Sequence, residues 1–99
     1  MILEIAQIDV KAGSEARFEA GVKNALPLFK AAKGCRGLEL TRSIENPRRY
    51  RLMIRWATLE NHTVDFRGSP DFQKWRALVA DCFDGAPQVE HVTQALKGF

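Results

Sequence analysis

The chain has 99 residues, of which 45% are hydrophobic and 27% charged. This is the composition of one globular domain over residues 1–99, and it excludes disordered and fibrous proteins. The net charge of +3 is too small an excess to favour nucleic-acid binding, and no apolar run approaches the roughly 20 residues of a membrane-spanning helix. Met1 leads into a strand-like segment with no signal-peptide pattern, and Cys35 and Cys82 form no C-x-x-C motif. We therefore expect a cytoplasmic protein with two buried free thiols.

The first two predicted elements are a strand and a helix. Residues 2–10 are rich in β-branched side chains and largely apolar on both faces, which indicates a central strand. The helix should begin after Ser14 as N-cap and stop at Gly34. Pro27 should kink or split it near Lys23, whose carbonyl loses its partner. The apolar positions that recur at helical spacing are Phe18, Val22, Ala25, Leu26 and Phe29.

Two alternating segments follow, residues 38–41 and 49–56, separated by the turn sequence 45–47. This pattern predicts an antiparallel hairpin, because the alternation places apolar side chains on one face of each strand.

The last third of the chain predicts two helices and a strand. Thr58 should cap a short helix that runs to about Phe66. Ser69 and Pro70 then form a strong second helix start. The apolar stripe of this helix is Phe72, Trp75, Leu78, Val79 and Cys82. Residues 88–96 alternate again and predict the final strand.

The element order is therefore strand, helix, strand, strand, helix, strand. This is the ferredoxin-like split βαβ pattern of an α+β domain, with a four-stranded antiparallel sheet and both helices on one face. The opposite sheet face would be partly apolar and uncovered. We expect a second copy to pack against it, sheet to sheet, in a homodimer.

Five linked segments between the third and fourth strands carry a family resemblance. They are residues 55–58 (RWAT), 60–62 (ENH), 66–70 (FRGSP), 75–78 (WRAL) and 87–91 (PQVEH). Together with the element order, they make nearly the whole chain similar to the antibiotic biosynthesis monooxygenase (ABM) domain family. The resemblance implies a dimeric α+β barrel. It also implies oxidation of a small phenolic, quinol or polyketide-like aromatic by O2 without a bound cofactor. The alternative is a non-enzymatic, dimeric ligand-binding or accessory protein of the same fold.

His62 and Arg67 are the candidate catalytic pair, with His62 as base and Arg67 as anion stabiliser. An imidazole beside a guanidinium could deprotonate a phenol or quinol and hold the anion, because the cation favours the charged form. The structural alternative for His62 is a hydrogen bond to a backbone carbonyl or to Glu60 or Asp65.

Five further residues are candidates for substrate binding. Arg76 and His91 would add polar contacts, but Arg67 and Arg76 could equally pair with Asp71 or Asp81, and His91 could be an ordinary strand residue. Aromatic side chains between helix and sheet are typical of small-molecule pockets. Those we assign to the pocket are Phe66, Phe72 and Trp75. For Phe72, as for Trp56, a place in the plain core is the favoured alternative.

Arginines surround the predicted hairpin, with Arg49, Arg51 and Arg55 on one strand face. An RNA-binding sheet would interleave stacking aromatics on that face, and only Met53 lies there. We therefore predict no nucleic-acid partner, and expect these arginines to meet acidic residues such as Glu39 or Glu90 on neighbouring strands or across a dimer.

The sequence predicts neither a metal site nor a cofactor. The two histidines and two cysteines have unrelated spacings, and no G-x-G-x-x-G or P-loop is present. Some members of the resembled family degrade haem, which they hold through a histidine seven residues after the serine of the Ser-Pro step. Here that position is Arg76, and the first-strand asparagine of those proteins is replaced by Gln7. Since arginine has no lone pair to offer iron, we expect no haem binding.

Overall fold

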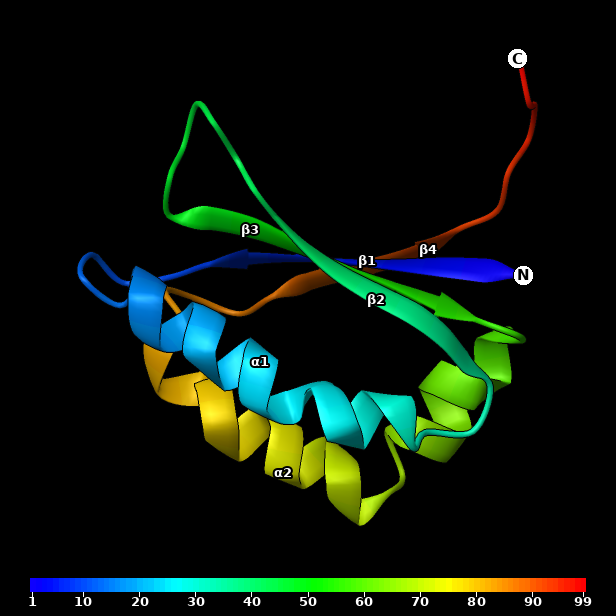
Figure 1. The fold of residues 1–99 in the computed structure, drawn as a ribbon, viewed down its shortest axis with the longest axis horizontal. Helices are drawn as coiled ribbons and strands as arrows, with labels where there is room; N and C mark the ends of the chain where they lie inside the picture. The colour runs from blue at the N-terminus through cyan, green and yellow to red at the C-terminus, as the bar shows by residue number, and fades with distance from the viewer.

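The centre of the fold is a four-stranded antiparallel sheet (Figure 1). The computed structural model describes residues 1–99. The elements in chain order are β1 (Ile2–Asp9), α1 (Glu15–Lys30), β2 (Cys35–Arg42), β3 (Arg49–Trp56), the π-helix η1 (Asn61–Phe66), α2 (Pro70–Val79), the short 3-10 helix η2 (Ala80–Cys82) and β4 (Gln88–Val92). The strand order in the sheet is β2-β3-β1-β4. The predicted ferredoxin-like α+β fold is thus confirmed. No helix is both long and apolar enough to cross a membrane.

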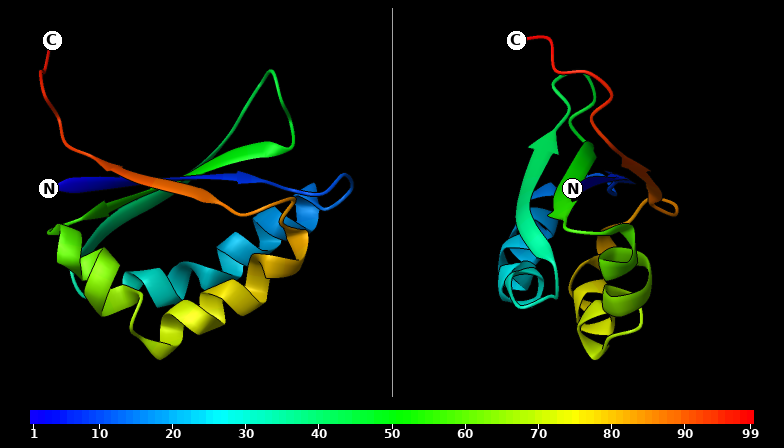
Figure 2. Two further views of the ribbon diagram at one scale, coloured as in Figure 1. Left: turned by 180° about the vertical axis from the view of Figure 1, so that it is seen from behind. Right: turned by 90° about the vertical axis from the view of Figure 1, so that its right-hand side faces the viewer.

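Both long helices cover the same face of the sheet, and the other face carries no helix (Figures 1 and 2). On β1 the side chains of Glu4, Ala6 and Ile8 are buried toward the helices, and the residues between them are half-buried on the opposite face. The two helices approach closely at Gly21, where an added Cβ would lie 2.9 Å from the carbonyl oxygen of Leu78. A larger side chain at this position would push α1 away from α2.

The core lies between the sheet and the helices. Its largest fully buried side chains are Trp56, Tyr50, Phe18, Ile8, Leu52 and Ile54. Because these residues come from three different elements, the core depends on the sheet register rather than on any local segment.

The expected split of α1 at Pro27 is not observed. The helix is continuous from Glu15 to Lys30, and Pro27 in its last turn removes only the one N–H that would bond the carbonyl of Lys23. Leu26 is also 42% exposed rather than part of the core stripe. Ser14 occupies the N-cap position as predicted, but its side chain makes no capping hydrogen bond.

Three other details differ from the sequence prediction. β4 ends at Val92 rather than at residue 96, and the following residues leave the sheet on the side away from the helices (Figure 2). Leu78 is 41% exposed and does not belong to the buried stripe of α2. Both cysteines are free thiols, but only Cys82 is buried, since Cys35 keeps intermediate exposure.

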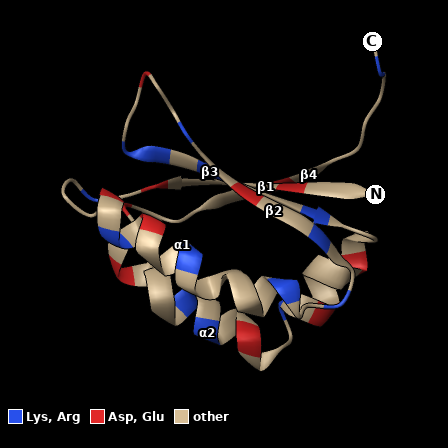
Figure 3. Cartoon of the chain, in the orientation of Figure 1, with Lys and Arg blue, Asp and Glu red and all other residues tan.

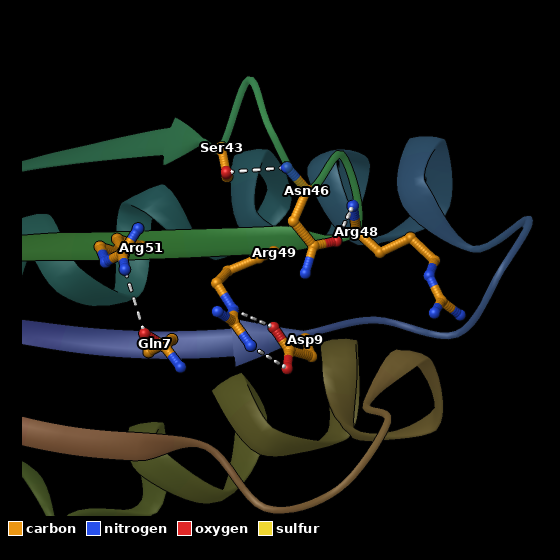
Figure 4. Close-up of polar contacts among 7 residues, drawn as sticks. All are labelled: Gln7, Asp9, Ser43, Asn46, Arg48, Arg49 and Arg51. Atoms are coloured by element: carbon orange, nitrogen blue, oxygen red, sulfur yellow. Dashed lines mark hydrogen bonds and ion pairs between the residues drawn. The ribbon is translucent and has the colours of Figure 1, made fainter.

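Two arginines of β3, Arg49 and Arg51, find partners on β1 (Figure 4). Arg49 donates to the carboxylate of Asp9 at 2.9 Å and 3.2 Å, and Arg51 donates to the amide oxygen of Gln7 at 3.2 Å. The partners are therefore not Glu39 or Glu90. Acidic and basic residues are interspersed on both helices (Figure 3).

Candidate functional site

A cavity of about 500 Å³ lies between the sheet and the segment from η1 through α2 to the start of β4. Most of its lining is hydrophobic, and four polar side chains complete it: Glu4, His62, Arg67 and Arg76. Its size and its mainly apolar lining with a few polar groups are typical of small-molecule sites.

The π-helix η1 carries His62 and Phe66 to the cavity wall. Thr58 Oγ1 accepts from the backbone N–H of Asn61 and so caps this segment, as predicted. The N–H of Arg67 reaches back five residues to the carbonyl of His62 at 3.1 Å, which is the wide turn of a π-helix. His62 and Phe66 are both buried and both line the cavity.

Gly34 determines where η1 can lie. Its φ is +77°, and a Cβ here would run into the side chain of Asn61. The amide of Asn61 accepts from the N–H of Thr58 at 3.1 Å and donates to Asp65 at 3.1 Å. The absence of a side chain at Gly34 therefore lets Asn61 hold the start of η1 in place, one residue before His62.

Glu4 is the functional candidate that the sequence prediction missed. The residue is only 5% exposed, although a glutamate with an ordinary pKa is charged at neutral pH and is normally solvated. Glu4 also lines the cavity. Trp56 donates its indole N–H to Oε1 of Glu4 at 2.9 Å. The other carboxylate oxygen, Oε2, has no hydrogen-bond partner in the protein. Because every fully buried polar side-chain atom does have a partner, Oε2 is not fully buried and is open to a molecule in the cavity. The signal in the sequence is a lone acid among the inward-facing positions of an apolar strand.

Glu4, His62 and His91 form a continuous chain of polar atoms. Nε2 of His62 lies 3.4 Å from Oε1 of Glu4, and Nδ1 of His62 lies 2.7 Å from Nε2 of His91. His91 does not line the cavity; it lies behind His62 on β4 and is partly exposed. This placement does not support direct contact between His91 and a substrate. His62 makes no hydrogen bond or ion pair with Glu60 or Asp65, which were its alternative partners.

Burial controls the protonation of these groups. It raises the pKa of Glu4 from 4.5 to about 7, against the lowering effects of the Trp56 hydrogen bond and of the Arg67 charge. It lowers the pKa of His62 to about 4, and the positive charge of Arg67 and the neighbouring His91 act in the same direction. Burial and Arg67 also lower the pKa of His91. Near neutral pH both imidazoles are uncharged, and Glu4 is the group that titrates.

Arg67 and Arg76 both line the cavity, and neither has a carboxylate within 4.0 Å. Asp71 instead pairs with Lys74 at 3.7 Å, and the guanidinium of Arg76 lies over the ring of Phe72 at 5.9 Å. The two arginines therefore converge on one cavity with their charges uncompensated by ion pairs.

The three predicted pocket aromatics, Phe66, Phe72 and Trp75, all line the cavity. Trp75 is 7% exposed and meets Phe29 edge-on at 5.2 Å. Trp56 lies outside the lining as a core residue, and it stacks on His62 with ring centroids 5.3 Å apart.

The residues weighed for a metal or haem are dispersed. No three His, Cys, Asp or Glu side chains form a group that could hold a metal ion. Gln7 is bonded to Arg51 on the helix-free face, away from the cavity, and Arg76 lines the cavity wall.

The fold and the cavity define a ferredoxin-like α+β domain with an internal, mainly apolar cavity. The sequence profile described as antibiotic biosynthesis monooxygenase (ABM) matches residues 1–78. The chain belongs to this family.

Individual relatives agree with this assignment. The protein YczJ of Bacillus subtilis, whose function is uncharacterized, is 37% identical over 91 residues, which cover 92% of this chain and 96% of YczJ. A crystal structure from Bordetella bronchiseptica, assigned to the antibiotic biosynthesis monooxygenases, is 57% identical with a TM-score of 0.94, covering 96% of this chain and 97% of that one. A variant of SnoaB, a cofactor-independent oxygenase from Streptomyces nogalater, has a TM-score of 0.83 at 14% identity, with coverage of 98% and 95%. At this identity SnoaB shows a shared fold alone.

Proposed function

We propose that the protein is a cofactor-independent monooxygenase that oxidises a small phenolic, quinol or polyketide-like aromatic with O2. The observation that carries this proposal is a set of three polar side chains in the cavity wall. The buried Glu4 and His62 lie 3.4 Å apart, and the unpaired guanidinium of Arg67 is near enough for its charge to act on both. The apolar remainder of the cavity suits a flat aromatic body.

In this proposal Glu4 and His62 act together as the base, whereas the sequence prediction gave that role to His62 alone. A carboxylate with a pKa of about 7 is better matched to neutral pH than an imidazole with a pKa of about 4. A free phenol has a pKa of about 10, so proton transfer to Glu4 is uphill in water. Arg67 offsets this difference because a nearby cation stabilises the phenolate.

The redox step then needs only the substrate and O2. The phenolate passes one electron to O2, and the resulting radicals join to form a C–O bond at the free carbon para to the hydroxyl. The peroxide takes up a proton. Loss of the para hydrogen as a proton with cleavage of the O–O bond leaves a second carbonyl and releases water. One phenol and one O2 thus give one quinone and one water.

Arg76 and the three aromatics would hold the substrate. Phe66, Phe72 and Trp75 offer ring faces and edges for a planar molecule. Arg76 lies where a second acidic group of the substrate could bind, since it has no carboxylate partner in the protein.

The test is O2 uptake with a panel of phenols and 1-naphthols that have a free carbon para to the hydroxyl. We expect one quinone per O2, with one labelled oxygen in the product from ¹⁸O₂. Glu4→Gln should lower kcat/KM by about 100-fold, the lower range for losing a proton acceptor. Arg67→Gln should also lower it by about 100-fold, because the developing phenolate loses the cation that stabilises it. The matched control is Arg51→Gln on the helix-free face, which should keep full activity.

The same experiment separates the alternative of a non-enzymatic binding protein. Saturable binding of these aromatics, seen as quenching of tryptophan fluorescence, with no O2 uptake above the Glu4→Gln variant would reject the oxygenase and support a binding role.

A further inference from the structure

The chain from Glu4 through His62 to His91 continues past the cavity wall to the protein surface. Glu4 and His62 are 5% and 4% exposed, whereas His91 is partly exposed on β4. We propose that His91 is the outer end of a proton relay that connects the buried carboxyl of Glu4 with solvent while an aromatic molecule occupies the cavity. This deepens the proposed function and rests on it for its use in catalysis.

The spacing and order of the atoms suit proton transfer along the chain from Glu4 to His91. At 2.7 Å, Nδ1 of His62 and Nε2 of His91 must share one hydrogen, because two lone pairs or two N–H groups would repel each other. If Glu4 gives a proton to Nε2 of His62 across 3.4 Å, the hydrogen on Nδ1 can pass to Nε2 of His91. Nδ1 of His91 has no partner in the protein and can release its hydrogen to water. The 3.4 Å step is long for a hydrogen bond, as is common at sites without substrate.

The surroundings keep the relay neutral and therefore able to pass a proton on. The charged and titratable groups near it are Arg67 at the end of η1, whose charge acts on all three members, and Cys35 on β2, which feels Glu4. Arg67 disfavours a lasting charge on either imidazole. A proton that reaches His62 therefore moves on to His91 or returns to Glu4, because a charged His62 is disfavoured.

A relay solves a specific problem of this cavity. An aromatic molecule that fills it displaces the water that would otherwise exchange protons with Glu4. The reaction needs a proton removed from the hydroxyl and one returned later to the peroxide. The relay can carry both, so the net proton balance remains zero.

The test uses side-chain ¹⁵N NMR to measure hydrogen exchange between the His62 ring and water, which needs no turnover. It is made on the free protein and on protein saturated with 4-nitrophenol, whose blocked para carbon prevents oxidation. His91→Gln is the decisive variant, because its amide can still accept from His62 but cannot relay a proton. His91→Phe removes both functions, and Glu90→Gln on the opposite face of β4 is the control.

We expect His91→Gln to slow exchange at His62 at least tenfold, with Glu90→Gln unchanged. In the oxygenase assay, kcat should fall by a similar factor and recover on adding free imidazole. Wild-type exchange in His91→Gln, in both the free and the saturated protein, would overturn the relay. If the exchange depends on His91 but no aromatic is oxidised, the relay stands as a property of the fold and the proposed reaction fails.

Discussion

Glu4 and His91 are direct partners in the antiparallel register of β1 and β4, and His62 bridges their side chains from η1. A strand pair alone would leave a buried carboxyl facing an imidazole. The π-helix brings the second imidazole between them and closes the chain of polar atoms. The site is therefore a product of the sheet register and of one unusual turn.

The raised pKa of Glu4 predicts a pH-dependent stability. Between about pH 4.5 and 7 the unfolded chain loses its Glu4 proton while the folded protein retains it. The free energy of unfolding should therefore fall as pH rises through this window, by up to about 3 kcal/mol. Glu4→Gln removes this fall, so the variant should gain stability relative to wild type between pH 5 and pH 8 in urea titrations.

The lowered pKa of His62 has the opposite effect on the free energy of unfolding. That free energy should fall as pH falls from about 6.5 toward 4, because the unfolded chain takes up the His62 proton before the folded protein does. Both proteins contain His62, so its effect should largely cancel in the difference. Parallel stability curves for the wild type and Glu4→Gln would contradict the assignment of a raised pKa to Glu4.

Trp75→Ala should weaken ligand binding more than it weakens the fold. The indole is a wall of the cavity, so its loss removes contact with a bound aromatic while the space beside it is already empty. We expect the Kd for 1-naphthol to rise tenfold or more in fluorescence titration, and thermal unfolding to show a small loss. A loss of about 3–5 kcal/mol, as for truncating a packed core aromatic, would place Trp75 in the core instead. Phe18→Ala, which is fully buried and outside the cavity, should show that larger loss with little change in Kd.

Gly34→Ala should destabilise η1. Both Gly34 and Gly13 have a positive φ, of +77° and +85°, but only Gly34 faces another side chain, that of Asn61. Gly13→Ala therefore measures the backbone strain alone, about 1–3 kcal/mol. Gly34→Ala should cost measurably more in chemical denaturation, and should displace His62 so that its ring resonances shift. Equal costs for the two variants would mean that Asn61 adjusts freely.

The uncovered sheet face predicts a homodimer. Leu3, Ile5 and Met53 are half-buried on this face, beside the arginines of β3. Sedimentation should give about twice the chain mass of 11.2 kDa. Ile5→Arg on this face should shift the protein toward monomer, whereas Leu78→Arg on the helical side should not. A wild-type monomer at micromolar concentration would reject the dimer.

Much of the fold could be predicted from the sequence alone, because its signals are local. The alternation of residues 49–56 correctly predicted the buried and exposed faces of β3. Ser69 and Pro70 correctly predicted the start of α2, where the Ser69 side chain accepts from the N–H of Phe72. The order of the elements then admits few topologies, and the ferredoxin-like arrangement is the one observed.

The site itself was only partly predictable. Residue type and resemblance pointed to His62, Arg67, Arg76 and Trp75, all of which line the cavity. Glu4 was missed because its chemical role depends on which residues surround it in the folded protein. A single acid on a strand is ordinary until burial deprives it of water and Trp56 and His62 become its neighbours.

The sequence by itself determined the order of the elements, the helix and turn signals, and the family, because each of these depends on neighbouring residues or on a linear motif. Only the tertiary structure decided which titratable groups meet, which of them are desolvated, and that His91 lies behind His62 rather than in the cavity. The physical reason is that pKa values and proton paths depend on distances and burial among residues far apart in the chain.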